Sequence, residues 1–258
     1  MAQTVREIVD AMRPITLDEM DSVKLLNRTD TKYVFCRTQL ADVLSHIAPN
    51  YAVLHINNTP YQQYRTTYFD TADDKMYIAH QNGKLNRYKV RHRTYLSTGA
   101  EFLEIKFKNN KGRTKKKRIE FPFVNPLYEA NEFIKKHSPF TGEQLFPKTL
   151  VEYTRVTLVD LVHGERCTVD TDLMVTNCIT GEKADFSHIC IIELKRDKSS
   201  AVSYMQEALL KNRIFRRGMS KYAIGTAVVY KEIKKNRFKK KIRYIDKLKV
   251  KYLESINS

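Results

Sequence analysis

Between residues 28 and 197 the chain contains repeated runs in which charged residues occupy every second position. The first run, NRTDTKYVF at residues 27–35, places Arg28, Asp30 and Lys32 two residues apart. Side chains in a β-strand alternate between the two faces of a sheet, so residues two apart share a face. The pattern therefore predicts a sheet with one charged face.

Seven further runs are strand-like, because they are rich in Val, Ile, Thr, Tyr and Phe. Turn signals such as Asn82-Gly83 and Lys111-Gly112 separate them. The runs are YQQYRTTYFD, RYKVRHRTYL, AEFLEIKFK, KKKRIEFPF, LVEYTRVTLVD, RCTVDTDLMV and CIIELKRD. With the opening run they are numerous enough to close into an antiparallel barrel of about eight strands.

Helices are predicted around these strands. The first 26 residues form two helical pieces broken at Pro14, and Thr16 with Glu19 makes a capping box for the second piece. Further helices are expected at residues 38–47, at about 128–137, at about 200–213 and from Ser220 to about Tyr230. We predict one α+β domain over residues 1–230 and a basic C-terminal tail over residues 231–258.

The charged sets are dominated by Arg and Lys, with few carboxylates. Arg65 and Arg155 stand in strands of their own, and the shared sets are Arg87, Lys89, Arg91 and Arg93; Glu104, Lys106 and Lys108; Lys116, Arg118 and Glu120; Arg166, Thr168, Asp170 and Asp172; and Glu193, Lys195 and Asp197. In a single strand this alternation indicates a solvated surface sheet. Repeated over many strands, the surplus of positive charge is self-repelling unless an anion neutralises it. A closed barrel would gather these faces into a basic tunnel, suited to a polyphosphate chain and its metal ions.

The net charge of +17 also indicates an anionic partner. The tail at residues 231–258 holds eleven Lys and Arg against Glu232, Asp246 and Glu254, which gives +8 and leaves +9 in the rest of the chain. Apolar residues alternate with the bases of the tail. The tail is therefore either an amphipathic helix that binds acidic lipid or polyphosphate, or a solvated or disordered basic end.

Several classes of protein are not supported. The chain has no long apolar run and no secretory signal, and its four cysteines lack the spacing of a zinc site. We expect a cytoplasmic protein with reduced thiols, open to membrane association through the tail. The glycines form neither a P-loop nor a dinucleotide-binding motif, so a bound nucleotide would be held by side chains.

The ordered motifs TDTKY, TTYFDT, RHRTY, FLEIK, EYTR, RCTVDTDL, IIELK and MSKY resemble those of the VTC domain over about residues 20–230. This family of polyphosphate polymerases lies within the triphosphate tunnel metalloenzyme superfamily. The resemblance implies a closed eight-stranded antiparallel tunnel flanked by helices. It also implies transfer of the ATP γ-phosphate to a growing polyphosphate chain, with Mn²⁺ or Mg²⁺ as cofactor.

The resemblance assigns roles to residues that match its motifs. Glu193 is the expected metal ligand, since a hard carboxylate oxygen suits Mg²⁺ or Mn²⁺. The expected catalytic, phosphate-contacting residues are Lys32, Arg91, Arg93, Lys106, Arg155, Arg166 and Lys221. Further substrate contacts are expected from Arg65, Lys89, Lys108, Lys116, Arg118, Lys195 and Ser220. Arg65 or a tyrosine near the entrance is the candidate for stacking on adenine.

Two positions depart from patterns of the superfamily. Triphosphatase and cyclase relatives commonly begin with Glu-x-Glu-x-Lys, whereas this chain has Arg28-x-Asp30-x-Lys32, which favours phosphate over metal at that end. A plain ion pair between Asp30 and Lys32 stays open. The family often has a basic residue two positions before the serine of its final motif, and here that position is Gly218.

Two other functions stay open beside the polymerase: a tunnel triphosphatase, and a non-catalytic protein that binds polyphosphate or another polyanion. The expected partners are ATP and polyphosphate, and no specific nucleic acid is expected. The tail is open to contact with a membrane or a membrane protein. The sequence does not define the oligomeric state. Asp170 and Asp172 are expected either to bind metal or, as we favour, to neutralise the charge of arginines. His92 is expected to be a packed or surface histidine rather than a catalyst, and Asp70 to cap the segment after its strand.

Overall fold

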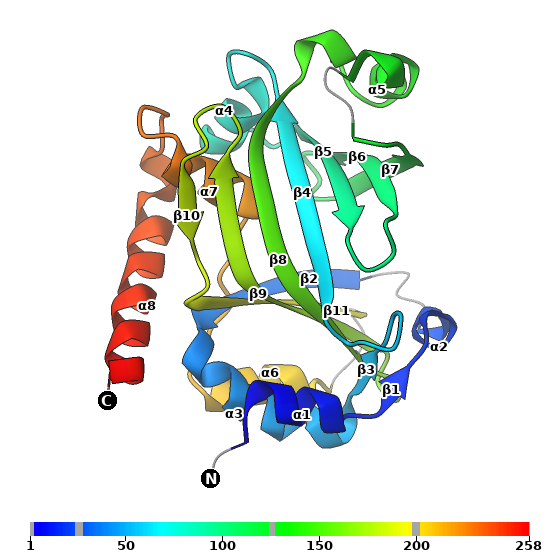
Figure 1. The fold of residues 1–258 in the computed structure, drawn as a ribbon, viewed down its shortest axis with the longest axis vertical. Coiled ribbons are helices and arrows are strands. Elements are labelled where there is room, and N and C mark those ends of the chain that lie inside the picture. The colour runs from blue at the N-terminus through cyan, green and yellow to red at the C-terminus, as the bar shows by residue number, and fades with distance from the viewer. Residues whose placement is uncertain (1–2, 24–27, 124–126, 198–201, 258) are drawn as a thin grey trace.

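The computed structural model describes residues 3–23, 28–123, 127–197 and 202–257. Its centre is one strongly curved sheet with the strand order β2-β11-β9-β8-β4-β5-β6-β7, in which all neighbours are antiparallel. Figure 1 shows β4 and β8 side by side, running from below α4 and α5 down towards β11. The strands are β2 (Arg28–Cys36), β4 (Gln62–Asp70), β5 (Arg87–Tyr95), β6 (Glu101–Lys108), β7 (Thr114–Glu120), β8 (Phe146–Asp160), β9 (Glu165–Asn177) and β11 (Ile189–Asp197). The α+β class and the eight principal strands are as predicted.

The predicted closed barrel is not seen, because the two ends of this strand path, β2 and β7, share no ladder in the described part of the chain. The free edge of β2 is bonded instead to the segment before helix α7, where the Arg217 amide donates to the Lys32 carbonyl at 2.7 Å. An isolated bridge joins Tyr33 to Arg216 in the same place. Strand β7 is exposed and lysine-rich, and such edge strands resist further pairing.

Three short strands were not predicted. Strand β1 (Pro14–Ile15) pairs in parallel with β3 (Ala52–Leu54), β3 pairs with β8, and β10 (Lys183–Asp185) pairs with β9. The helices are α1 (Val5–Ala11), α2 (Leu17–Ser22), α3 (Leu40–Ile47), α4 (Lys75–Gln81), α5 (Asn131–His137), α6 (Tyr204–Lys211), α7 (Lys221–Val229) and α8 (Lys239–Asn257), with 3₁₀ turns at Arg37–Gln39, Ala48–Asn50, Leu127–Ala130, Gly142–Gln144 and Asn236–Phe238. The capping box of Thr16 and Glu19 is present at α2, as predicted.

The outer face of the sheet is covered by helices. Helices α1, α3 and α6 lie beneath β2, β9 and β11 (Figure 1), and their apolar side chains pack on that face together with Cys167 and Val169. Around α5, the preceding 3₁₀ turn buries Leu127 against Leu103 and Ile105 of β6. The alternation predicted for β6, and for β9 as far as Asp170, is therefore confirmed, since the apolar residues face outward under helices and the charged residues face inward.

Helix α7 fills one half of the inner face of the sheet. It is buried on nearly every side, and a Cβ atom at Gly225 would lie 2.9 Å from a methyl carbon of Val175. Ser220 caps its first turn by accepting a hydrogen bond from the Ala223 amide at 3.2 Å. The strands beneath α7 present apolar side chains such as Val34 and Ile191. The charged residues occupy the other half of the inner face.

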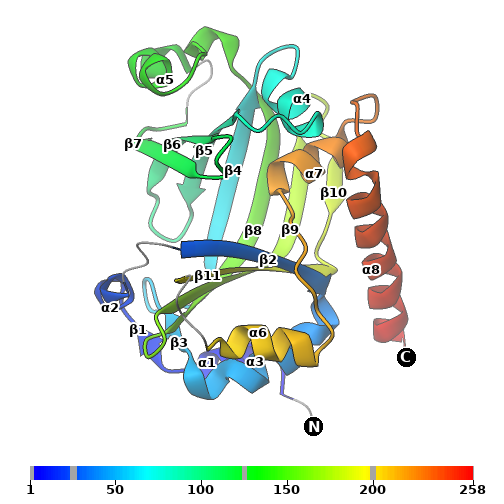
Figure 2. The same cartoon turned by 180° about the vertical axis from the view of Figure 1, so that it is seen from behind.

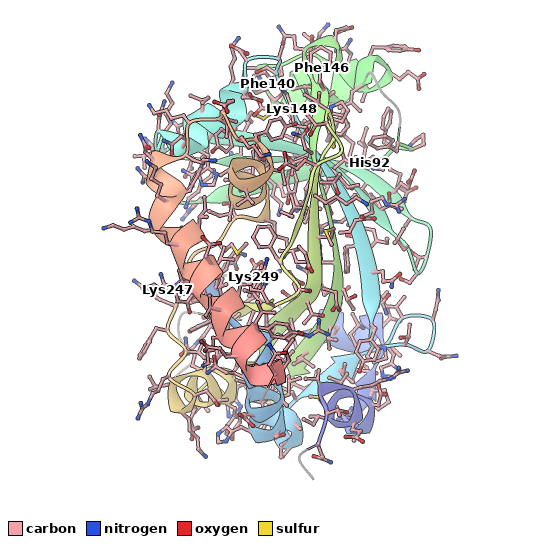
Figure 3. The ribbon with its side chains drawn as sticks, turned by 60° about the vertical axis from the view of Figure 1, so that its left-hand side comes forward. His92, Phe140, Phe146, Lys148, Lys247 and Lys249 are labelled. Atoms are coloured by element: carbon pink, nitrogen blue, oxygen red, sulfur yellow. The ribbon has the colours of Figure 1, made fainter. Side chains whose placement is uncertain are left out.

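The C-terminal tail forms a helix that packs on the domain. Helix α8 runs beside β10 in both views (Figures 1 and 2), with Phe238, Ile245 and Leu248 buried. Lys247 and Lys249 are exposed on α8 (Figure 3). A disordered tail is therefore wrong, and the domain covers the first part of its apolar stripe, whereas Val250, Leu253 and Ile256 are exposed. Among the described residues no helix is long and apolar enough to span a bilayer.

Candidate functional site

Charged side chains from six strands and from α7 meet on the half of the inner face that α7 leaves uncovered. The register explains the meeting, because Lys89 lies opposite Lys106, Arg91 opposite Glu104, and Lys32 opposite Glu193. We call this set the basic inner face. Its members are Lys32, Lys89, Arg91, Arg93, Glu104, Lys106, Tyr153, Arg155, Asp170, Glu193, Ser220 and Lys221.

Asp170 neutralises two bases of this face. The Arg155 guanidinium donates to both carboxylate oxygens of Asp170, at 2.6 and 2.8 Å, and the Lys221 ammonium pairs with the same carboxylate. Burial acts to raise the pKa of Asp170, but Arg155 and Lys221 hold it well below its usual range. The favoured role of Asp170 in charge balance is confirmed.

A second buried acid fixes Arg91. The Arg91 Nε atom donates to Glu104 at 2.6 Å, and the Lys116 ammonium donates to the other oxygen of that carboxylate at 2.7 Å. Glu104 is fully buried, and its pKa lies well below the ordinary value because its cationic neighbours outweigh the effect of burial. Arg91 is therefore held in one orientation before any ligand binds.

Tyr153 holds the bases around it through its hydroxyl and its ring. The Arg93 guanidinium donates to the hydroxyl at 3.0 Å, and the Lys221 ammonium lies 4.4 Å from the ring centroid. The Tyr64 ring stacks on Tyr153 at 5.2 Å. Although burial acts to raise it, the pKa of Tyr153 is lowered by Arg93, Arg155 and Lys221. This lowering shows how positive the potential is inside the curve of the sheet.

Lys89 and Lys106 form no ion pair with a carboxylate of the described residues. Lys89 donates to the Ser220 hydroxyl at 2.9 Å. Burial and then Arg87 and Arg91 lower the pKa of Lys89 to about 7. Arg91 first, and then burial, lower the pKa of Lys106 to about 6. These two positions favour an anion that would stabilise their charged forms.

Lys32 pairs across the strands with Glu193, while Asp30 lies opposite Lys195 in the ladder. Burial raises the pKa of Glu193, but Lys32 and Lys195 lower it to about 2. No group of three or more His, Cys, Asp or Glu side chains that could hold a metal occurs in the described part of the chain. Glu193 therefore fits a metal ion only as an ionised carboxylate that completes a shell made mainly of substrate phosphates.

A pocket of about 640 Å³ near α2 adjoins the basic inner face through Tyr64, which lines the pocket and stacks on Tyr153. Its wall includes Tyr64, Tyr95 and Phe102, and the Arg118 guanidinium lies 4.5 Å from the Phe102 ring. Arg166 lines it too, and donates to the Val23 carbonyl at 2.7 Å. The pocket thus joins aromatic surface to cationic groups. A second cavity, of about 560 Å³, lies away from it beside α1.

Three other predicted site residues lie at the margins of the basic inner face or outside it. Lys195 lines the pocket near α2. Lys108 is exposed on the inner side of β6, opposite Arg87. Arg65 is not brought to the others, because it lies exposed on the outer face of β4 and its Nε atom donates to Glu152 at 3.0 Å. The neighbours of Arg65 in the chain take the inward positions of that strand.

The prediction that Asp172 shares a face with Asp170 is wrong. A register shift lies between β8 and β9, and Asp172 adopts a left-handed backbone conformation with φ of 52°. The extra residue turns Leu173 inward and leaves Asp172 exposed, where it pairs with Arg37. Asp172 nevertheless balances an arginine, as favoured.

Two smaller predictions are confirmed. His92 is buried on the outer face, with Nε2 2.8 Å from the Phe121 carbonyl oxygen. Asp70 caps α4 by accepting from the Met76 and Tyr77 amides at 2.9 and 2.8 Å. Tyr153 was not among the predicted site residues, although its position two residues before Arg155 was a usable signal.

A family model and several solved structures are similar to this chain. The family model described as VTC domain matches residues 27–230. A candidate adenylyl cyclase from Hippeastrum, reported to have a dominant triphosphatase activity, is similar in structure with a TM-score of 0.50 and 14% identity, over 77% of this chain and 95% of that chain. A candidate adenylate cyclase from Bacillus halodurans gives a TM-score of 0.46 and 14% identity, over 75% and 94% of the two chains. No curated protein matches. At such identity the Hippeastrum protein supports the tunnel fold alone.

Proposed function

Because the chain belongs to the VTC domain family, a group of tunnel-type phosphoryl-handling proteins, we propose that it is a metal-dependent polyphosphate polymerase. It would transfer the γ-phosphate of ATP to the end of a growing polyphosphate chain. The observation that carries the proposal is the pair Lys89 and Lys106, which lie half-buried beside fixed arginines and form no ion pair in the described structure. A row of phosphates would supply the negative charge that neutralises these two lysines.

The fixed bases suit phosphoryl transfer. This reaction needs little covalent chemistry from a protein, so positioning and charge neutralisation account for most of its catalysis. Arg91, Arg93 and Arg155 are held by Glu104, Tyr153 and Asp170, and each keeps a planar donor group near the space above the sheet. The terminal phosphate of the acceptor chain acts as the nucleophile. The reaction then requires no nucleophilic side chain.

Two further roles complete the proposal. Glu193 would hold a divalent ion, Mn²⁺ or Mg²⁺, and the bound ion would supply neutralisation of charge on the phosphate oxygens. The pocket near α2 would take the adenosine end of ATP, since Tyr64, Tyr95 and Phe102 offer aromatic surface. This replaces Arg65 as the candidate for stacking on adenine, because Arg65 lies on the outer face.

A tunnel triphosphatase is the second candidate function. It is favoured by the likeness to the Hippeastrum protein, for which a triphosphatase activity is reported. The same bases and the same carboxylate would serve hydrolysis, with water in place of the acceptor phosphate. The two functions therefore differ only in the group that attacks the γ-phosphate.

The test is incubation of the purified protein with ATP labelled at the γ-phosphate, Mn²⁺ and a short polyphosphate, followed by gel separation of the products. A ladder of lengthening labelled chains with an equal amount of ADP would support the polymerase. Release of free orthophosphate alone would move the assignment to triphosphatase. Unchanged ATP would contradict both and leave a polyanion-binding protein.

A further inference from the structure

A second group of bases lies at the end of the basic inner face that is farther from α2. Its members come from four separate segments: β5, the turn before α7, the 3₁₀ turn at Asn236–Phe238, and α8. We call it the tail cluster, and its members are Arg87, Arg217, Arg237 and Lys241. Two of them belong to the C-terminal tail, which the sequence alone set apart from the domain.

The tail cluster contains no acid partner. None of its four bases forms an ion pair with a carboxylate among the residues that the structure describes. Burial, and then Arg237 and Arg217, lower the pKa of Lys241 below its ordinary value. Like charges held together without an acid destabilise the free protein, so this arrangement needs a reason other than stability.

The tail cluster is continuous with the basic inner face through Lys89. Burial first, and then Lys89, Arg87, Lys241 and Arg237, lower the pKa of the neighbouring His80 to about 3. The Nδ1 atom of His80 is buried and has no hydrogen-bond partner in the described structure. His80 is therefore a neutral imidazole in a strongly positive field that spans both groups of bases.

Packing fixes the position of Lys241. The Tyr244 hydroxyl donates to the Val34 carbonyl at 3.1 Å, the Arg217 guanidinium lies 3.7 Å from the Tyr244 ring, and Ile245 is buried. The Lys241 ammonium then lies 3.8 Å from the point where a Cβ atom of Gly218 would be. The tail thus brings a cation to Gly218, two residues before Ser220, whose hydroxyl is bonded to Lys89 of the basic inner face.

The loop after α4 makes room for the second tail base. A Cβ atom at Gly83 would lie 2.4 Å from the Arg237 guanidinium, and Gly83 has a φ of 74°. The backbone conformation favours glycine at this position, and a side chain there would displace the Arg237 guanidinium. The Arg237 guanidinium therefore lies against the loop after α4, although Arg237 is exposed, as Lys247 is.

We infer that Arg87, Arg217, Arg237 and Lys241 form a second phosphate-binding site, whose ligand is the part of an inorganic polyphosphate chain that extends beyond the basic inner face. The identity of the ligand rests on the proposed function. A long chain reaches both groups of bases, whereas tripolyphosphate is held by the inner face alone. The C-terminal helix is thereby a component of the substrate site.

The test uses a double variant that carries both Arg237→Ala and Lys241→Ala. The matched control is Lys247→Ala. Affinities for long-chain polyphosphate and for tripolyphosphate are measured by calorimetry with the full chain. The double variant should bind long chains about tenfold more weakly, as expected for about 1.4 kcal/mol of lost phosphate contacts. Its affinity for tripolyphosphate should be unchanged. Its melting temperature should equal or exceed that of the wild type, because two mutually repelling cations are removed.

The outcomes separate this inference from the proposed function. If wild-type protein binds long chains and the double variant binds them as tightly as Lys247→Ala does, the second site is overturned whether or not ATP is turned over. If the predicted loss occurs in a protein that makes no polyphosphate, the second site stands and the polymerase fails. If wild-type protein binds no polyphosphate at all, both are overturned.

Discussion

Two sets of bases on the basic inner face differ in what neutralises them. Arg155 and Lys221 share the buried carboxylate of Asp170, so this side of the face is balanced before any ligand arrives. Lys89 and Lys106, on β5 and β6, form no ion pair in the described structure, and the effect of Glu104 on Lys106 is smaller than that of Arg91 and Arg93. The first set is organised by the protein. The second set is left for a ligand to neutralise.

This difference separates positioning from binding. A base with a buried acid partner keeps one geometry, which is what a reaction that depends on alignment requires. A base without one raises the free energy of the empty protein, and a bound anion removes that cost. The contrast predicts that removing an acid from the balanced set lowers the stability of the protein. Removing bases from the other set should raise the stability of the protein and weaken ligand binding.

The largest effect is expected from Asp170→Asn. The change leaves two buried cations with no shared acid, and breaking a buried ion pair in this way costs about 3–5 kcal/mol of unfolding free energy. Urea denaturation measures the loss. The control is Asp172→Asn, whose exposed pair with Arg37 should cost about 1 kcal/mol or less. Equal losses in the two variants would show that Asp170 does not organise the balanced set.

Glu193→Gln should lower turnover about 100-fold or more, because it removes the carboxylate proposed to hold the metal. Binding of polyphosphate should persist or strengthen, since an acid is lost from a basic face. Glu152→Gln is the control, because this carboxylate lies on the outer face beside Arg65. Turnover equal to that of the control would show that the assignment of Glu193 to the metal is wrong.

The pKa values of Lys89 and Lys106 predict a pH dependence. In the folded protein these are lowered to about 7 and about 6 from an ordinary 10.5, so the unfolded chain binds more protons at intermediate pH. Stability contributed by the two groups therefore rises with pH between about pH 6 and pH 10. A double variant that carries both Lys89→Met and Lys106→Met should lose this rise in stability with pH. The double variant should be more stable than the wild type, and the difference in unfolding free energy should be largest at the acidic end of this pH range.

Urea denaturation across this pH range tests the prediction, with exposed Lys75→Met as the control. A second measurement uses the ligand: polyphosphate should restore the charged forms, so its binding near pH 8 should take up protons in the wild type and fewer in the double variant. A stability difference that is the same at every pH would contradict lowered pKa values at these lysines.

Alternation along the strands was enough to predict the charged side of the sheet. Arg91, Lys106 and Glu193 were placed on one face by counting residues, and the structure brings them to the same face. Counting residues predicted the wrong face where a β-bulge interrupts the alternation of side chains. The bulge at Asp172 adds one residue to β9, and nothing in RCTVDTDLMV distinguishes that position from its neighbours.

The open edge of the sheet and the tail could not be predicted for a different reason. Both depend on long-range contacts: β2 bonds to the segment at Arg217, and α8 packs on the domain through Ile245 and Leu248. The tail's apolar spacing indicated an amphipathic helix but not the surface that it would cover. The base supplied by Lys241 beside Gly218 is a consequence of that packing alone.

The smallest effect is expected from Arg65→Ala, which tests whether the inward and outward faces of β4 differ as the structure shows. Arg65 contacts Glu152 on an exposed surface, so its loss should change the unfolding free energy by about 0.5 kcal/mol or less and leave turnover unchanged. The matched variant Arg93→Ala removes an inward base bonded to Tyr153 and should lower turnover markedly. Urea denaturation and the labelled ATP assay measure both variants. If Arg65→Ala lowered turnover as much as Arg93→Ala, substrate would have to reach the outer face, and the assignment of the reaction to the basic inner face would be wrong.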